Sequence, residues 1–257
     1  MAVICFDAHA HCAAIADSDL PLMLERARLN GVGAIINTAT NLVTAQRVLE
    51  QHALHSQLLP AIGISPFDVL ALNSGWETAL QALAHDSRTV AIGEIGIDTT
   101  NPRYPALSVQ RPVFEFQLAL ARACNLPAVI HSRGAEAQAL AMCIDCGINR
   151  AVFHCYTGSR AVLSDIVDKG YFVSFSGIIT FGQNAVAELV RYVPLESVLV
   201  ETDSPYLAPV PLRGKPNEPA NAALVAGQVA ALRGCTTAVL SLQLQKNFAA
   251  LFQKATV

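Results

Sequence analysis

The chain has 257 residues, of which 53% are hydrophobic and 14% charged, and its formal net charge is -3 at pH 7. This apolar composition excludes an intrinsically disordered chain. The slightly acidic balance argues against a surface built for non-specific nucleic-acid binding, although a local basic or metal-bearing site could still bind phosphates. The length suits one α/β barrel of about 250 residues or two smaller domains.

The sequence carries no feature that indicates export or a membrane. No basic residue precedes Arg26, and no separable apolar core with a small-residue cleavage site follows the start, so a signal peptide is not expected. The longest uncharged stretch, residues 29–46, is too polar for hydrocarbon. Seven cysteines, an odd number spread through a large chain, suit reduced thiols. We therefore expect a cytoplasmic protein with no membrane partner, and nothing indicates an obligate protein partner.

Short apolar runs recur along the chain with helical patterns between them. Eight of these runs are candidate strands: Val3–Asp7, Ala34–Thr38, Leu58–Gly63, Val90–Glu94, Ala128–His131, Ala151–His154, Tyr171–Ser174 and Ser197–Glu201. Most are nearly continuous in apolar residues, as expected for parallel strands covered on both faces. Eight βα units in about 250 residues predict a (βα)8 TIM barrel, as a single domain over residues 1–257. The Pro-rich segment 208–219 is expected to be a long loop after the eighth strand.

Two histidines, His9 and His11, follow the first predicted strand. In an extended segment, residues two apart point to the same side, so both imidazoles can reach one metal ion. Alone, this pair is weak evidence, because two ordinary histidines would produce the same pattern.

Further candidate ligands occur at the C-terminal ends of other predicted strands. They are Glu94, His131, His154 and, just past the eighth strand, Asp203. Barrel active sites are built on this face, so the six residues are predicted to converge. Imidazole nitrogens and carboxylate oxygens suit Zn, Mn or a related divalent ion. Six ligands exceed one tetrahedral site but fit two ions bridged by a carboxylate, for which Glu94 is the natural candidate.

Two other sources of metal or redox chemistry are less well supported. A carbamylated lysine could bridge two metals, but no lysine of the chain lies at a predicted strand end. Cys143 and Cys146 have redox-pair spacing without a second pair, and we interpret them as free thiols. Cys155 follows His154, but adjacent strand residues point to opposite faces, so it is not included among the ligands.

Several motifs resemble, in the same order, those of the TatD family of metal-dependent deoxyribonucleases. They are Phe6-Asp-Ala-His-Ala-His11, Gly93-Glu-Ile-Gly-Ile-Asp98, Ile130-His-Ser-Arg133, Phe153-His-Cys-Tyr-Thr-Gly158, Ser174-Phe-Ser-Gly-Ile-Ile-Thr-Phe181 and Glu201-Thr-Asp-Ser-Pro-Tyr-Leu207. The resemblance implies a divalent-metal barrel that hydrolyses phosphodiester bonds in DNA, commonly as an exonuclease. It also implies the same six ligands: His9, His11, Glu94, His131, His154 and Asp203.

The chain departs from the family pattern near the expected site. Where the family usually has Gly-x-His-Pro, the sequence reads Gly63-Ile-Ser-Pro66, and Asp98 is followed by Thr99-Thr100 in place of aromatic residues. Ser65 cannot be cationic or act as a general acid near neutral pH. The departure therefore bears on substrate preference and rate, while the expected metal ligands are all present.

The sequence suggests a mechanism in which two divalent ions (Mg, Mn or Zn) activate a water, Asp203 takes its proton and Glu94 holds the ions in register. Candidate substrate contacts are Ser65, Ser132, Arg133, Arg213, Lys215 and Asn217. Candidate aromatic residues for base stacking are Tyr156, Phe181 and Tyr206. Glu201 is expected to support a ligand from behind rather than to bind metal directly.

Two alternatives stay open at this stage. An amidohydrolase that cleaves a C–N or ester bond of a small metabolite would use the same metal-activated water, because fold does not fix function. A non-catalytic metal-binding protein is the second alternative, but such a protein would be expected to have lost ligands.

Overall fold

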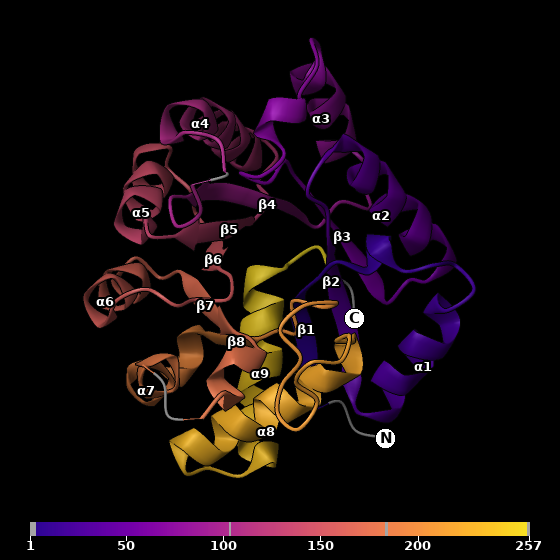
Figure 1. The fold of residues 1–257 in the computed structure, drawn as a ribbon, viewed down its shortest axis with the longest axis vertical. Helices are drawn as coiled ribbons and strands as arrows, with labels where there is room; N and C mark the ends of the chain where they lie inside the picture. The colour runs from indigo at the N-terminus through magenta and orange to yellow at the C-terminus, as the bar shows by residue number, and fades with distance from the viewer. Residues whose placement is uncertain (1–3, 103, 183–184, 256–257) are drawn as a thin grey trace.

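The computed structural model describes residues 4–102, 104–182 and 185–255, in which eight parallel strands pair in chain order (Figure 1). The strands are β1 (Cys5–Ala10), β2 (Val32–Thr38), β3 (Leu58–Ile62), β4 (Ala91–Asp98), β5 (Ala128–Arg133), β6 (Ala151–Phe153), β7 (Phe172–Phe175) and β8 (Val198–Val200). The helices are α1 (Leu20–Leu29), α2 (Leu42–Leu54), α3 (Trp76–Ala84), α4 (Leu107–Ala123), α5 (Glu136–Asp145), α6 (Arg160–Asp168), α7 (Ala185–Tyr192), α8 (Ala222–Arg233) and α9 (Thr237–Leu251). The predicted (βα)8 barrel is confirmed, and one domain over residues 1–257 remains our proposal.

The seam between the first and last strands is closed by a short parallel bridge. Ala10 pairs with Ser204 just beyond β8. The amide of Asp203 donates to the carbonyl of His9 at 2.9 Å, and the amide of His11 donates to the carbonyl of Ser204 at 2.8 Å. The closure therefore places three of the predicted ligands, His9, His11 and Asp203, side by side.

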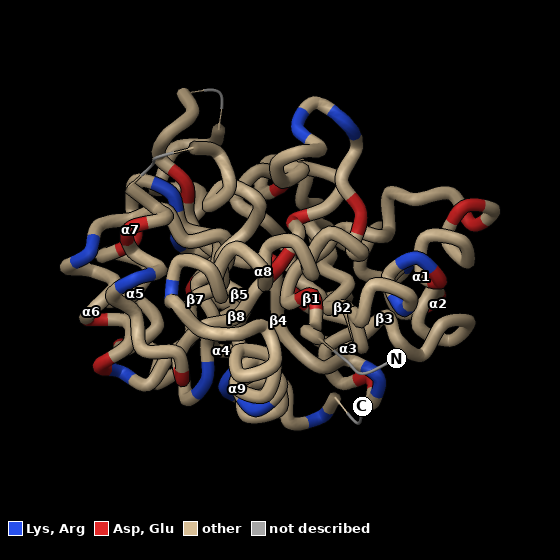
Figure 2. The backbone as a smooth tube through the Cα atoms, turned by 90° about the horizontal axis from the view of Figure 1, so that it is seen from below, with Lys and Arg blue, Asp and Glu red and all other residues tan. Residues whose placement is uncertain are grey.

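The base of the barrel is filled by a small apolar core. Buried residues of the strands, among them Ala8, Ala34 and Ala61, cluster there with Phe248 and Leu251 of α9. Figure 2, turned by 90°, shows α9 below the strands, so this helix covers the base. A larger apolar cluster packs the surrounding helices onto the strands. The strands are thus buried on both faces, which accounts for their nearly continuous apolar sequences.

The inner layer changes from apolar to polar toward the C-terminal ends of the strands. Residues two apart share a face of a strand. In three strands or their extensions, an apolar residue of the inner core is followed two positions later by a polar residue: His131 after Val129, His154 after Val152 and Glu201 after Leu199. The polar face of the barrel therefore lies opposite α9.

Several strand boundaries differ from those predicted. The first strand continues to Ala10 rather than ending at Asp7, and the predicted starting residue, Val3, lies outside the described residues. The fourth strand extends past Glu94 to Asp98, and the fifth past His131 to Arg133. These extensions follow from a register irregularity between β4 and β5, after which the two strands pair again. The long loop predicted over 208–219 is present between β8 and the short 3-10 turn Pro219–Asn221.

Among the described residues, no single helix has the length and hydropathy of a membrane span. The segments Pro219–Arg233 and Thr237–Leu251 pass that test only as a pair, and they are bent by 113° relative to each other.

Candidate metal centre

Four ligand atoms form a compact group at the seam of the barrel. His9 Nε2 lies 3.2 Å from His11 Nε2, and both nitrogens lie 3.5–3.6 Å from Glu94 Oε2. The Asp203 Oδ1 atom lies 3.8 Å from His9 Nε2 and 3.4 Å from His11 Nε2. A tetrahedral ion with bonds of about 2.0–2.1 Å has ligand atoms about 3.3–3.4 Å apart. The spacing of this group therefore suits a single divalent ion.

A second group of ligand atoms forms around the other oxygen of the same glutamate. Glu94 Oε1 lies 2.8 Å from His131 Nδ1 and 3.5 Å from His154 Nε2. The two imidazole nitrogens are 3.2 Å apart. Glu94 thus presents one oxygen to each group, which is the arrangement predicted for a bridging carboxylate. The structure brings all six predicted ligands together.

Hydrogen bonds from behind orient two of the imidazoles. His131 Nε2 lies 2.9 Å from Asp98 Oδ2, and His11 Nδ1 lies 3.1 Å from the carbonyl oxygen of Thr38. Such partners on the far ring nitrogen fix the tautomer and orientation of metal-binding histidines. Asp98 was not predicted as a site residue, because the irregularity in β4 hides from the sequence that this residue lies at the end of the strand, opposite Arg133.

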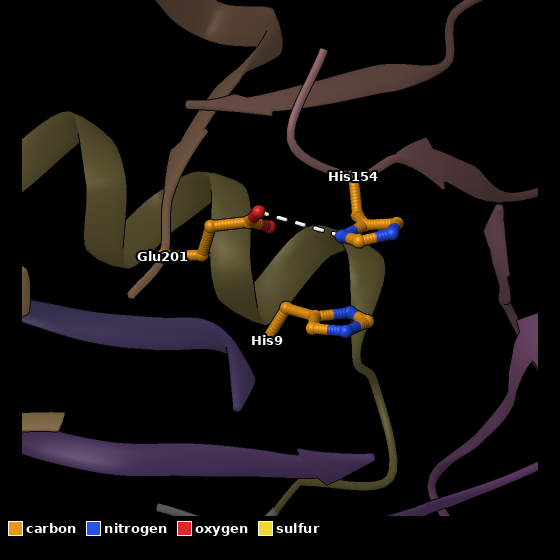
Figure 3. A group of neighbouring side chains, drawn as sticks. All are labelled: His9, His154 and Glu201. Atoms are coloured by element: carbon orange, nitrogen blue, oxygen red, sulfur yellow. Dashed lines mark ion pairs between the residues drawn. The ribbon is translucent and has the colours of Figure 1, made fainter. Parts of the chain in front are cut away.

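Glu201 faces His154 from the inner wall of the barrel, as Figure 3 shows. Its Oε1 atom lies 3.4 Å from His154 Nδ1, while Ser174 Oγ donates to its Oε2 atom. The His9 and His154 rings stack with centroids 3.9 Å apart and an interplanar angle of 9°. His9, His154 and Glu201 also offer one donor atom each within 4.8 Å of one another. The contact with His154 Nδ1 agrees with the supporting position expected for Glu201.

The charges in the centre compensate one another. Burial raises the pKa of Glu94, but contacts with His131, His154 and His9 lower it by more than burial raises it. The pKa of Glu94 is therefore well below its usual range. Burial likewise raises the pKa of Asp203, and the His11 contact reverses this effect. The pKa of His154 is raised to about 10 against the opposing effect of burial, because Glu201 and Glu94 stabilise its charged form. Both ligand carboxylates therefore stay ionised at neutral pH, as metal coordination requires.

The chemistry of the donors fits divalent metal ions. Two groups of imidazole nitrogen and carboxylate oxygen atoms share Glu94, and the side chains of the six candidate ligands are at most 14% exposed. Buried charged and polar groups of this kind are normally paired or bind metals.

The Arg133 side chain reaches the edge of the centre. Its guanidinium donates to Thr157 Oγ1 at 2.8 Å and to Cys155 Sγ at 3.0 Å. Burial lowers the pKa of Arg133, but the nearby Cys155, Asp203 and Glu201 raise it overall, so the guanidinium stays charged near the carboxylates of the centre. This position suits a substrate contact.

Two other predicted substrate contacts, Ser132 and Asn217, remain predictions, and their positions are less favourable for contact with a substrate. Ser132 lies on β5 between His131 and Arg133, so its side chain points to the opposite face of the strand from these residues. Asn217 is buried and donates from Nδ2 to the carbonyls of Thr202 at 2.8 Å and Tyr206 at 2.6 Å. Its Oδ1 also accepts two hydrogen bonds, so the Asn217 side chain is used in holding the loop after β8.

Ser65 is fully buried after β3, and its Oγ has no hydrogen-bond partner in the described part of the chain. Its amide donates to the carbonyl of Thr40 at 2.8 Å. A substrate contact for Ser65 remains a prediction.

Arg213 and Lys215 are exposed on the loop after β8. They line a cavity of about 500 Å³ together with Phe181, and the Arg213 guanidinium lies 4.0 Å above the centre of the Phe181 ring. The loop therefore presents two cationic side chains and an aromatic ring to solvent. Tyr156, by contrast, is buried and donates from its hydroxyl to the carbonyl of Ser159, so it is unavailable for base stacking.

A cavity of about 570 Å³ opens beside the ligands His11 and Glu94. Three aromatic residues line it: Tyr206, which the sequence indicates as a stacking candidate, and Phe67 and Tyr104, which it does not. Phe67 follows the Ser65-Pro66 departure, and Tyr104 lies in the loop where the usual aromatic pair after Asp98 is replaced. Each lies a few residues after a position at which the sequence departs from the family pattern. An aromatic residue elsewhere in the same loop is therefore the signal that could have identified Phe67 and Tyr104.

Comparisons with known proteins agree with this architecture. The family model described as TatD related DNase matches residues 6–253. An uncharacterized metal-dependent hydrolase, YabD, of Bacillus subtilis is 34% identical over 253 residues, covering 96% of this chain and 98% of the relative. A 3'-5' ssDNA/RNA exonuclease, TatD, of Klebsiella pneumoniae is 33% identical over 238 residues, with 90% of each chain covered.

Among solved structures, YJJV, a TatD homologue from Escherichia coli K12, superposes with a TM-score of 0.93 at 29% identity, covering 98% of this chain and 99% of that one. A TatD family hydrolase from Entamoeba histolytica shares the fold, with a TM-score of 0.89 at 20% identity over 98% of this chain and 99% of that one. The chain therefore belongs to the TatD-related DNase family, in which similar proteins carry the names of metal-dependent hydrolases and exonucleases.

Proposed function

We propose that this protein is a divalent-metal-dependent hydrolase that cleaves phosphodiester bonds in DNA and releases nucleotides from a strand end. The observation that carries the proposal is the shared carboxylate: Glu94 presents one oxygen to His9 and His11 and the other to His131 and His154. Paired metal sites of this kind serve phosphoryl transfer, in which attacking and leaving oxygens must both be stabilised. The names of the relatives support the same substrate class.

Glu94 would contribute to holding two divalent ions (Mg, Mn or Zn), and the chemistry supplied by such ions is the polarisation of a phosphodiester oxygen and a lowered pKa of the attacking water. His9, His11 and Asp203 would hold one ion, and His131 and His154 the other. Asp98, Thr38 and Glu201 orient the imidazoles from behind.

Asp203 is the proposed acceptor of the proton from the attacking water. Its side chain is 13% exposed, whereas that of Glu94 is 3% exposed, so Asp203 is the ligand carboxylate that solvent reaches more readily. Its lowered pKa, set by the His11 contact against burial, keeps it ionised and able to accept a proton. Glu94 is enclosed and positions both donor groups.

Cationic side chains at the mouth of the barrel are the proposed phosphate contacts. Arg133 lies at the edge of the centre, and Arg213 and Lys215 lie on the loop after β8. Arginine and lysine bind phosphate oxygens through charge-assisted hydrogen bonds.

The seven cysteines are free thiols, which supports our proposal that the protein acts in the cytoplasm.

The test uses single-stranded DNA labelled at either end, incubated with protein that has been stripped of metal and reloaded with Mg, Mn or Zn. We expect metal-dependent release of nucleotides, abolished by Asp203→Asn with the fold retained in circular dichroism. No release with any of these ions, despite tight stoichiometric binding of metal, would contradict the proposal and favour hydrolysis of a small amide or ester.

A further inference from the structure

The cavity beside the metal centre carries aromatic side chains from three separate loops. Phe67 follows β3, Tyr104 precedes α4 and Tyr206 follows β8. The ligands His11 and Glu94 line the same cavity. The aromatic rings and the candidate catalytic groups therefore share one space of about 570 Å³, within the range of about 300–1,000 Å³ common for small-molecule sites.

Two of these aromatic rings lie directly against ligand imidazoles. The Phe67 ring meets that of His131 edge to face, with centroids 4.9 Å apart, and packs against Tyr104 at 4.5 Å. The Tyr206 ring lies 6.1 Å from that of His11, and its side chain is 61% exposed. One ring thus borders each group of ligand atoms, so a planar ligand held against them lies next to the reacting bond.

The charges of the cavity favour an uncharged part of the substrate. None of the described residues that line it is a lysine or an arginine, whereas it contains the carboxylates of Asp68 and Glu94. Asp68 Oδ2 accepts a hydrogen bond from Asn41 Nδ2 at 3.1 Å, which fixes its position. The cationic candidates, Arg213 and Lys215, line a different cavity. Away from the metal ligands, the described lining of the cavity therefore offers a phosphate no cation, whereas a neutral base needs none.

We propose that this cavity binds the base of the nucleotide next to the scissile phosphate, by stacking on Phe67 and Tyr104 with Tyr206 covering it. This inference rests on the proposed nuclease function. Each base has a π-face that aromatic side chains can hold regardless of sequence. The cavity therefore recognises the presence of a base while leaving its identity open.

The test compares cleavage of two single-stranded oligonucleotides, one intact and one with an abasic residue at the strand end that the enzyme attacks. Wild-type protein is expected to cleave the intact strand with a kcat/KM about 5- to 150-fold higher. In Phe67→Ala and in Tyr104→Ala this ratio should fall to within about twofold of one. The ratio cancels any loss of activity that affects both substrates, including a loss of metal by Phe67→Ala, and metal content is measured in each variant.

Tyr192→Ala is the matched control, because this half-exposed tyrosine on α7 lies against Arg160, among residues that line a different pocket. It should keep the wild-type ratio. Equal cleavage of both strands by the wild type would overturn this inference alone, as would a ratio unchanged in both cavity variants. Failure of the wild type to cleave either strand would overturn the proposed function and this inference with it.

Discussion

Glu94 is the residue on which the two groups of ligand atoms depend, because each group uses a different oxygen of its carboxylate. Its side chain is enclosed, and three histidines lower its pKa against the effect of burial. His131 contributes to one group only. Substitutions at these two positions should therefore differ in how many ions the protein retains.

We predict that His131→Gln lowers the bound divalent metal from two ions per chain to about one, while Glu94→Gln lowers it below one. The physical reason is that His131 serves one site and Glu94 serves both. Elemental analysis after dialysis measures the ratio directly. Equal losses in the two variants would show that the oxygens of Glu94 do not divide between two ions.

The protonation of the histidines predicts how metal binding depends on pH. Contacts with Glu201 and Glu94 raise the pKa of His154 to about 10 despite burial, and contacts with Asp203 and Glu94 likewise raise the pKa of His11. The His154 ring then carries a proton at pH 7 in the metal-free protein, and the protonated form of His11 is favoured, so an ion must displace a proton from the centre.

Metal binding at pH 7 should therefore release protons, and the apparent affinity should rise from pH 6 to pH 8 as these protons become easier to remove. Calorimetric titrations in buffers of different ionisation enthalpy give the number of protons released. A heat independent of the buffer, with an affinity that is flat over this range, would contradict the assignment of a charged His154.

At the scale of the elements, the contact between β4 and β5 sets the position of the centre. Pairing is irregular between Ile92 and Ile95, around Glu94, and resumes from Ile95 to Asp98. Gly96 has a φ of 148°, and a Cβ there would lie 1.9 Å from the carbonyl oxygen of His131. The close approach of the strands thus depends on the absence of a side chain at Gly96.

We expect Gly96→Ala to lower the free energy of unfolding by about 3 kcal/mol, because β4 must move away from β5. Gly170→Ala is the matched control: this residue also has a positive φ, of 75°, but a Cβ would meet no atom within 4 Å. It should cost about 1 kcal/mol. Denaturant unfolding of both variants measures the difference, and equal losses would mean that φ alone, without the strand contact, decides the effect.

Much of this arrangement follows from local sequence patterns. Apolar runs bounded by helical patterns predict the eight strands, and chemistry-bearing residues just after them predict the six ligands, because all strands of a parallel barrel end on one face. The boundaries of β4 could not be predicted, since the irregularity at Glu94 arises from packing against the neighbouring strand β5.

The substrate contacts were harder to predict because they depend on tertiary detail. Whether Ser132 or Arg133 faces the site depends on which residues of β5 point into the barrel. The Asn217 side chain donates to the carbonyls of Thr202 and Tyr206, which come near it only when the loop is folded. Phe67 and Tyr104 meet across two loops that are far apart in sequence.

At the scale of the whole molecule, charges of both signs are interspersed around the periphery (Figure 2). With a net charge of -3, the protein as a whole does not attract nucleic acid, so binding must come from local cations. Arg213 and Lys215 are exposed on the loop after β8, whereas Lys246 is exposed on α9 at the base of the barrel. Removal of the loop cations should therefore weaken DNA binding, whereas removal of cations at the base of the barrel should not.

The double variant Arg213→Ala/Lys215→Ala should bind single-stranded DNA more weakly and reduce the slope of log K against log salt by about 1, because up to two phosphate contacts are lost. Binding is measured by fluorescence anisotropy with catalysis blocked by Asp203→Asn. Lys254 is exposed just after the end of α9, so Lys246→Ala/Lys254→Ala removes the same charge far from the loop in sequence and should leave the slope unchanged. Equal slopes in the two double variants would remove the loop from the substrate path.

The central claim is that six side chains bind two ions that together hydrolyse a phosphodiester. Its most direct test is a titration of Mn²⁺ into metal-stripped protein, in which bound ions and nucleotide release from single-stranded DNA are followed in the same samples. We predict two equivalents bound per chain, with nucleotide release that rises as the second equivalent binds. Two equivalents bound without release of nucleotides, or full release with one, would contradict the account.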